Sequence, residues 1–296
     1  MVLKIYLTKL RGLLGNMRQV HVNEIVERVK ALSVEINTGL GEDIVDALKK
    51  AAEMEESSIG KEVLGHLLEN IKIAREESLP ICQDTGLAVI FVEMGQDVHI
   101  IGGDLREAIN EGVRQGYREG YLRKSVLNDP LLRENTGDNT PVIIHFEIVP
   151  GDSLKIKMAA KGGGSENSSA MRMMKPSDGA TGIEEFVLDT VKKAWANPCP
   201  PIIVGVGIGG NFEMAPILAK KALFRRLGGH NPAPHLAELE GELLAAVNRL
   251  GIGPEGFGGT VTALAVQIEA APCHIASLPV AVNIDCHVSR HREVIL

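Results

Sequence analysis

The chain has 296 residues, of which 45% are hydrophobic, 23% charged and only 3% aromatic, as in a globular protein with an aliphatic core. The net charge of −7 disfavours nucleic acid or an anionic membrane surface as the main partner, although a local basic pocket could hold a small anion. Four cysteines form no disulfide framework, and no apolar run reaches the roughly 18 residues of a membrane span. We therefore expect a cytoplasmic protein with reduced thiols and no membrane partner.

Residues 1–17 are mildly basic and apolar, and lysines and an arginine interrupt the apolar run. They do not have the form of a secretory signal. We expect an N-terminal arm here, either disordered or produced by a start codon placed too early. From residue 20 to about 78, apolar side chains recur every three or four residues in three runs. This period predicts a layer of helices, the third beginning near Ser57.

Beyond residue 80 the sequence alternates between strand and helix signals. Strands are predicted at 87–93, 97–101, 202–207, 261–268 and 275–284, and helices at 104–118, 182–195, 212–225 and 234–249. A long polar loop runs to residue 140, after which 142–149 and 154–158 are predicted to pair as a β-hairpin. No repeat and no convincing linker is visible. The sequence therefore predicts a single α/β domain over residues 18–296, with a helical N-terminal layer followed by mixed sheets flanked by helices.

Three of the four cysteines stand at the ends of predicted strands. Cys82 precedes an apolar run, Cys199 lies between prolines before the strand at 202, and Cys286 follows the strand that ends near 284. Their wide spacing matches no zinc-ribbon or ferredoxin pattern. Three thiolates without a fourth would suit a [4Fe–4S] cluster with one iron open to a substrate oxygen. Isolated buried thiols are the alternative that the residues alone leave open.

Other polar groups at these junctions are also candidates. Asp84 stands two residues after the first of these cysteines and is explained equally well as a capping aspartate. The run 161–164, Lys-Gly-Gly-Gly, could hold an anion on bare backbone N–H groups or form a flexible exit from the hairpin. Gly205-x-Gly207-x-x-Gly210 has the form of a dinucleotide fingerprint, although structural turns explain its glycines more simply. His274 and His287 are the acid–base candidates among the histidines.

Taken together, five segments resemble the class I, iron–sulfur fumarate hydratases in their order and spacing. More narrowly, they resemble the α subunit of the two-subunit type, in a family that also includes the L-tartrate dehydratase α subunit. The segments are residues 82–86, 161–167, 197–201, 251–259 and 283–287. The resemblance covers roughly residues 20–296.

The resemblance implies specific site residues. It implies an oxygen-sensitive [4Fe–4S] cluster on Cys82, Cys199 and Cys286, with Cys273 left over as a structural thiol. It implies catalytic roles for Asp84 and His274, and it implies substrate contacts from Gln83, Asp84, Arg123, Gly163, Gly164 and His274.

The activity that the resemblance implies is the reversible hydration of fumarate to (S)-malate. In single-chain relatives the catalytic threonine base and several cationic contacts lie in a second half that this sequence lacks. The chain is thus expected to work with a separate β subunit, as α2β2, on a small dicarboxylate. L-tartrate or another hydroxy-diacid is the alternative substrate. Alternatives of other classes are a non-catalytic iron–sulfur or redox protein and a nucleotide-binding module that uses residues 205–210.

Overall fold

The structure is a computed structural model that describes residues 17–296. The chain forms two compact units, each assembled from segments far apart in sequence. Unit 1 comprises the described residues up to Ile36, Leu87–Ala160 and Arg292–Leu296, and unit 2 comprises Asn37–Gly86 and Lys161–His291. Because the chain passes repeatedly between the units, no single linker divides it. The predicted arm at 1–17 lies outside the described residues except for Met17.

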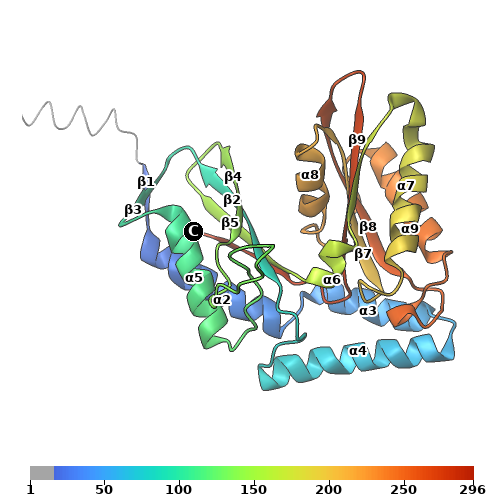
Figure 1. The fold of residues 1–296 in the computed structure, drawn as a ribbon, viewed down its shortest axis with the longest axis horizontal. Helices are drawn as coiled ribbons and strands as arrows, with labels where there is room; N and C mark the ends of the chain where they lie inside the picture. The colour runs from blue at the N-terminus through green and yellow to red at the C-terminus, as the bar shows by residue number, and fades with distance from the viewer. Residues whose placement is uncertain (1–16) are drawn as a thin grey trace, which may run out of the picture. The chain divides into compact units, whose positions relative to one another are not determined.

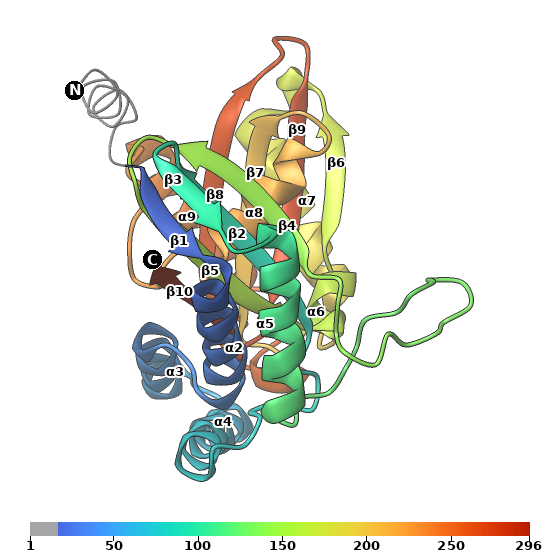
Figure 2. The same ribbon diagram turned by 90° about the vertical axis from the view of Figure 1, so that its left-hand side faces the viewer.

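Unit 1 contains a sheet in the order β10-β5-β2-β4 and a parallel pair, β1 and β3. Its elements are β1 (Arg18–His21), α2 (Val22–Thr38), β2 (Leu87–Gly95), β3 (Val98–Ile101), α5 (Leu105–Glu119), β4 (Ile143–Val149), β5 (Leu154–Lys161) and β10 (His291–Ile295). Helices α2 and α5 lie side by side (Figure 2). Their backbones come so close that a Cβ on Gly116 would lie 2.5 Å from the Cβ of Ser33. Fully buried Ile25, Ile90 and Ile109 join both helices to β2 in one core.

The predicted β-hairpin of 142–149 and 154–158 is wrong. Both strands form, but β2 lies between them: β4 pairs in parallel with β2, and β5 lies on the other side of β2. The physical reason is the apolar run of β2, which is buried on both faces from Ala88 to Val92 and so takes the central place in the sheet. Strand β4, with exposed Phe146 and Ile148, stays at the edge.

Unit 2 is built on a second sheet in the order β6-β9-β7-β8. Its elements are α3 (Glu42–Met54), α4 (Ser58–Glu77), α6 (Gly163–Asn167), β6 (Ala170–Met174), η1 (Pro176–Asp178), α7 (Gly179–Ala194), β7 (Ile202–Gly210), α8 (Met214–Ala222), α9 (Pro234–Asn248), η2 (Pro254–Gly256), β8 (Ala263–Cys273) and β9 (Leu278–Asp285). Figure 1 shows α8 on one face of this sheet and α7 and α9 on the other. Helices α3 and α4 lie across the end of the sheet where β7 begins (Figure 1).

The glycines of the dinucleotide-like pattern lie inside strand β7 rather than in a loop after it. A Cβ on Gly205 would lie 2.2 Å from the carbonyl oxygen of Ala219, and one on Gly207 would lie 2.0 Å from that of Ala215. These glycines therefore let α8 pack directly on the strand, and they form no phosphate-binding turn.

The predicted α/β fold class is confirmed, including the helical N-terminal segment and the helices that flank the later strands. Ser57 is the N-cap of α4, and its side chain accepts a hydrogen bond from the Gly60 N–H at 3.2 Å. Helix α4 ends at Ser78 in the left-handed conformation, and the chain then turns toward Cys82. None of the helices in residues 17–296 is both long enough and apolar enough to cross a membrane.

Candidate active site

The three cysteines at strand junctions all belong to unit 2 and gather at one end of its sheet. Cys82 follows α4, Cys199 precedes β7 and Cys286 follows β9, whose last residue pairs with Ile203 near the start of β7. The carbonyl oxygen of Cys199 accepts a hydrogen bond from the N–H of His287 at 3.4 Å and lies 3.0 Å from its Nδ1. Cys82 and Cys286 pack against the same apolar cluster. The fold thus brings together thiols that are 117 and 87 residues apart in sequence.

The surroundings of two of these thiols, those of Cys199 and Cys286, favour the protonated form. Burial, followed by the charges of Glu255 and Cys82, raises the pKa of Cys199 to about 11. Burial, followed by the charge of Asp285, raises the pKa of Cys286 to about 12, although Arg290 and Lys161 act in the opposite direction. Both thiols are therefore protonated at neutral pH in the metal-free chain, and a metal that binds them must displace these protons.

The donor set fits a cluster better than a single ion. Within residues 17–296 no three His, Cys, Asp or Glu side chains are grouped closely enough to hold one metal ion. An iron–sulfur cluster spreads its thiolate ligands over several iron atoms, so its cysteines need not meet at one point. Close in sequence to Cys286, the buried Oγ of Ser289 and Nε of Arg290 have no hydrogen-bond partner in the described structure. Buried donors of this kind fit a bound group that carries acceptor atoms.

Asp84 is held firmly beside the first cysteine. Its Oδ2 accepts a hydrogen bond from the N–H of Gly163 at 2.7 Å, and its Oδ1 accepts one from the N–H of Gly86 at 3.0 Å. Gly86 has φ of +72°, and a Cβ there would lie 2.7 Å from the carbonyl oxygen of Lys161, so a larger residue would not fit. Gln83 is exposed, and its Oε1 accepts a hydrogen bond from the Cys82 thiol at 3.6 Å. Asp84 therefore both caps the first turn of α6 and keeps a fixed carboxylate next to Cys82.

Lys161, which precedes the glycine run, is buried and bonds to other groups of the protein. Its side chain is 4% exposed, and Nζ donates to Ser165 Oγ at 2.8 Å and to the Ile284 carbonyl at 2.6 Å. It also lies 3.4 Å from Glu166. Burial by itself would raise the pKa of Glu166, but Lys161 and then Lys220 outweigh it and lower this pKa to about 2. The partners of this ammonium group are thus groups of the protein itself.

One predicted site residue of unit 2 lies away from the three cysteines. His274 is in the connection between β8 and β9, and the seven residue steps of β9 put this connection about 23 Å from the end where Cys286 lies. It is exposed, and its Nδ1 accepts a hydrogen bond from the Ala276 N–H at 3.1 Å. Cys273 is at the same end of the sheet, apart from the other thiols. Arg123 belongs to unit 1, where it is exposed near the start of the polar loop.

The sequence did not point to Glu255, which lies at the centre of the glycine loop at 251–259. Its Oε1 is 3.2 Å from Nδ1 of His287, and its N–H donates to the Pro200 carbonyl at 2.8 Å. Its φ is +50°, a conformation that costs a non-glycine residue about 1–3 kcal/mol and that is concentrated at functional sites. From the sequence alone, a glutamate among glycines would be taken for a solvated loop residue. The fold places its carboxylate beside Cys199.

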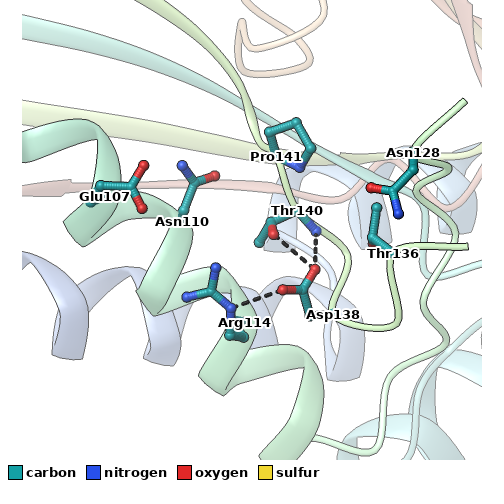
Figure 3. A pocket seen from close by; sticks show the side chains of 8 residues that line it. All are labelled: Glu107, Asn110, Arg114, Asn128, Thr136, Asp138, Thr140 and Pro141. Atoms are coloured by element: carbon teal, nitrogen blue, oxygen red, sulfur yellow. Dashed lines mark hydrogen bonds and ion pairs between the residues drawn. The ribbon is translucent and has the colours of Figure 1, made fainter.

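A separate polar hollow of about 300 Å³ lies in unit 1 and contains none of the predicted site residues. Figure 3 shows Arg114 and Asp138 pointing toward each other across it, at 2.9 Å. Burial would raise the pKa of Asp138, but Arg114 and Thr140 lower it to about 2. The charges at the centre of this hollow neutralise each other, so it is not the candidate active site.

Comparison with known proteins decides the family. Residues 26–295 match the sequence model of the family described as fumarate hydratase (fumerase). The chain belongs to this family. It is 46% identical over 257 residues to a Methanocaldococcus jannaschii protein named "Putative L(+)-tartrate dehydratase subunit alpha", covering 85% of this chain and 90% of that relative. It is 32% identical over 283 residues to the L(+)-tartrate dehydratase subunit alpha of Escherichia coli (strain K12), covering 94% and 93%.

The family predicted from the five motifs is therefore confirmed, and with it the expectation of a hydro-lyase. Members of this family add water to a carbon–carbon double bond or remove it. The match includes all the elements of unit 2 and most of those of unit 1.

Proposed function

We propose that the chain is the α subunit of a cytoplasmic [4Fe–4S] hydro-lyase that acts on a small dicarboxylate together with a separate β subunit. The observation that carries this proposal is the meeting of Cys82, Cys199 and Cys286 at one end of the unit 2 sheet, with Asp84 fixed beside Cys82. Further support comes from the names of the relatives, which describe α subunits. Reduced thiols that hold iron also fit a reducing compartment.

The residues of this chain would divide the work between them. Cys82, Cys199 and Cys286 would hold the cluster, which when bound supplies a Lewis acid for the hydroxyl group that is added or removed. Asp84 carries a carboxylate whose direction is fixed by two backbone N–H groups, so it can hold or move a proton at that hydroxyl without reorganising. Gly163 would act through Asp84, because its N–H already donates to that carboxylate.

The remaining predicted contacts come from other parts of the chain. Gln83 is exposed beside Cys82, and Gly164 follows Gly163 in the first turn of α6, so both would face the same substrate. Arg123 would supply a cation for a substrate carboxylate. Negative charge builds up on the substrate as a proton leaves its carbon. The β subunit would supply most of the groups that stabilise this charge. We expect an α2β2 assembly.

Two substrates compete within this proposal. Fumarate and (S)-malate are predicted from the sequence motifs and agree with the name of the family. L(+)-tartrate is favoured by the printed names of both relatives. Malate and tartrate differ by one hydroxyl group. A site built to bond a hydroxyl can reject an analogue that lacks it by about 10⁴–10⁵-fold.

The test is anaerobic co-purification of this chain with its β subunit, followed by iron and sulfide analysis and by assays on fumarate, malate, L(+)-tartrate and mesaconate. We expect a cluster in the pair and water addition or elimination on one of the four-carbon acids. If the α–β complex holds its cluster with four protein ligands and turns over none of these acids, a non-catalytic iron–sulfur protein would be favoured instead. Nucleotide binding without iron would favour the nucleotide-binding module.

A further inference from the structure

Arg290 is a buried cation for which the described chain offers no ion-pair partner. The residue is 2% exposed, and none of the ion pairs among residues 17–296 includes it. Its Nη1 donates to Asn37 Oδ1 at 3.1 Å and to the carbonyl oxygen of Asp84 at 2.7 Å. Its buried Nε has no hydrogen-bond partner in the described structure. Both of the acceptors it does have are neutral.

Burying a charged side chain without an opposite charge costs free energy. A buried cation of this kind therefore indicates that an anion binds beside it. Arg225 of the same unit shows the usual arrangement, since its Nη1 forms an ion pair with the carboxylate of Glu240. Among the described ion pairs, none matches buried Arg290 in the way that Glu240 matches half-buried Arg225, which leaves the charge of Arg290 for an anion outside the described side chains.

The position of Arg290 shows where that anion would be. It follows Cys286 by four residues, in the segment that leads from β9 to β10. It also supports the backbone of Asp84, two residues beyond Cys82. A Cβ on Gly162 would lie 3.7 Å from Nη2 of Arg290 and 3.4 Å from Oδ2 of Asp84, so the guanidinium reaches the start of α6 as well. Arg290 therefore touches the segments of two of the proposed ligands.

We propose that Arg290 supplies the counter-charge for the bound iron–sulfur cluster and its Cys286 thiolate, with Nε as a free donor toward them. This inference rests on the proposed function. Three thiolates and the inorganic sulfides give the cluster region a negative charge, which a buried guanidinium would stabilise more in the reduced than in the oxidised state. Arg290 is thus a positioning and electrostatic residue, and it need not contact the substrate.

The test compares Arg290→Gln, Arg290→Lys and Arg225→Gln in the chain purified anaerobically with its β subunit. The readouts are iron and sulfide per chain, the reduction potential of the cluster measured by EPR-monitored titration, and thermal unfolding of the metal-free pair. We expect Arg290→Gln to lower the potential and to lose iron severalfold faster in air. Arg290→Lys should recover most of the potential, because it keeps the charge. Arg225→Gln should lower thermal stability and leave the potential of the remaining cluster unchanged.

The outcomes that overturn the inference are separate from those that overturn the proposed function. If the wild-type pair holds no iron–sulfur cluster, the proposed function fails. If the wild type holds one and Arg290→Gln keeps the same potential and rate of iron loss, only the role of Arg290 fails. A potential that falls equally in Arg290→Lys and Arg290→Gln would also contradict it, because the effect would then come from shape instead of charge.

Discussion

The N–H of Gly163 donates a hydrogen bond of 2.7 Å to Oδ2 of Asp84, and this bond joins two segments that are 79 residues apart in sequence. The first segment carries Cys82, and the second begins helix α6. Because the other carboxylate oxygen of Asp84 is bonded to the N–H of Gly86, the side chain has one fixed direction. If Cys82 holds a cluster as proposed, this carboxylate needs no further ordering to transfer a proton beside it.

Asp84→Asn should abolish most of the turnover and leave the cluster in place. The amide keeps the size of the side chain but cannot take up a proton, and general acid–base groups contribute about 10²–10⁴-fold to rate. Turnover and iron content of the α–β pair are the measurements. Asp189→Asn, on the exposed face of α7, serves as the control. Turnover within a factor of about two of the wild type in Asp84→Asn would remove this residue from the mechanism.

His274→Asn should lower turnover with no loss of iron. The imidazole is exposed in the β8–β9 connection, and among the described residues its Nε2 has no hydrogen-bond partner, so it can contact a group from outside this chain. This connection lies far from the three thiols along β9, and the variant should therefore keep the absorbance spectrum of the cluster. An unchanged kcat/KM would show that His274 is only a turn residue.

Glu55→Ala should destabilise the fold by about 2–4 kcal/mol, because a buried carboxylate that accepts several backbone hydrogen bonds would be lost. Glu55 is 1% exposed and accepts from the N–H groups of Ser57, Thr260 and Val261, at 2.8, 2.9 and 2.8 Å. It thereby ties the α3–α4 junction to the end of the glycine loop. Urea denaturation measures the free energy of unfolding. Exposed Glu56→Ala is the control and should change it by less than about 0.5 kcal/mol; equal effects from both would contradict this account.

The stability contributed by Glu166 should disappear in acid. Lys161 and Lys220 lower its pKa from 4.5 to about 2, against the effect of burial. A carboxylate whose pKa is depressed in the folded state stabilises the protein above its unfolded pKa, and this stabilisation is lost as the pH falls through the folded value. The difference in Tm between the wild type and Glu166→Gln should thus be constant above about pH 5 and shrink between pH 4.5 and pH 2. A difference that does not change with pH would show that the ion pairs contribute nothing. Exposed Glu238→Gln is the matched control.

Sequence periodicity located most helices and strands because their apolar residues face one core. Ser57 and Asp104, for example, cap helices close to where the sequence predicts their starts. The pairing of strands was less predictable. The two strands around Pro150 are neighbours in sequence, but β2 lies between them because its side chains need cover on both faces. Short strands with many exposed residues, such as β6 and β10, have no clear apolar pattern and were missed.

The three candidate ligands could be proposed from the sequence, whereas the residues that surround them could not. Cys82, Cys199 and Cys286 are rare residues at strand ends, and a thiol in such a place is visible in a sequence. Arg290 and Glu255 are charged residues in polar segments, which usually lie in solvent. Their roles depend on burial and on contacts with residues far away in the chain, such as Asn37 for Arg290, and no local pattern records these.

The central claim is that three cysteines of this chain hold the cluster, and the most direct measurement is iron per α subunit in single serine variants purified anaerobically with the β subunit. Cys82→Ser, Cys199→Ser and Cys286→Ser should each lose most of the iron, because each removes one thiolate. Cys273→Ser should keep the wild-type amount, because this thiol lies at the opposite end of the unit 2 sheet from Cys286. Full iron in any one of the first three variants, or equal loss in Cys273→Ser and Cys82→Ser, would contradict the assignment.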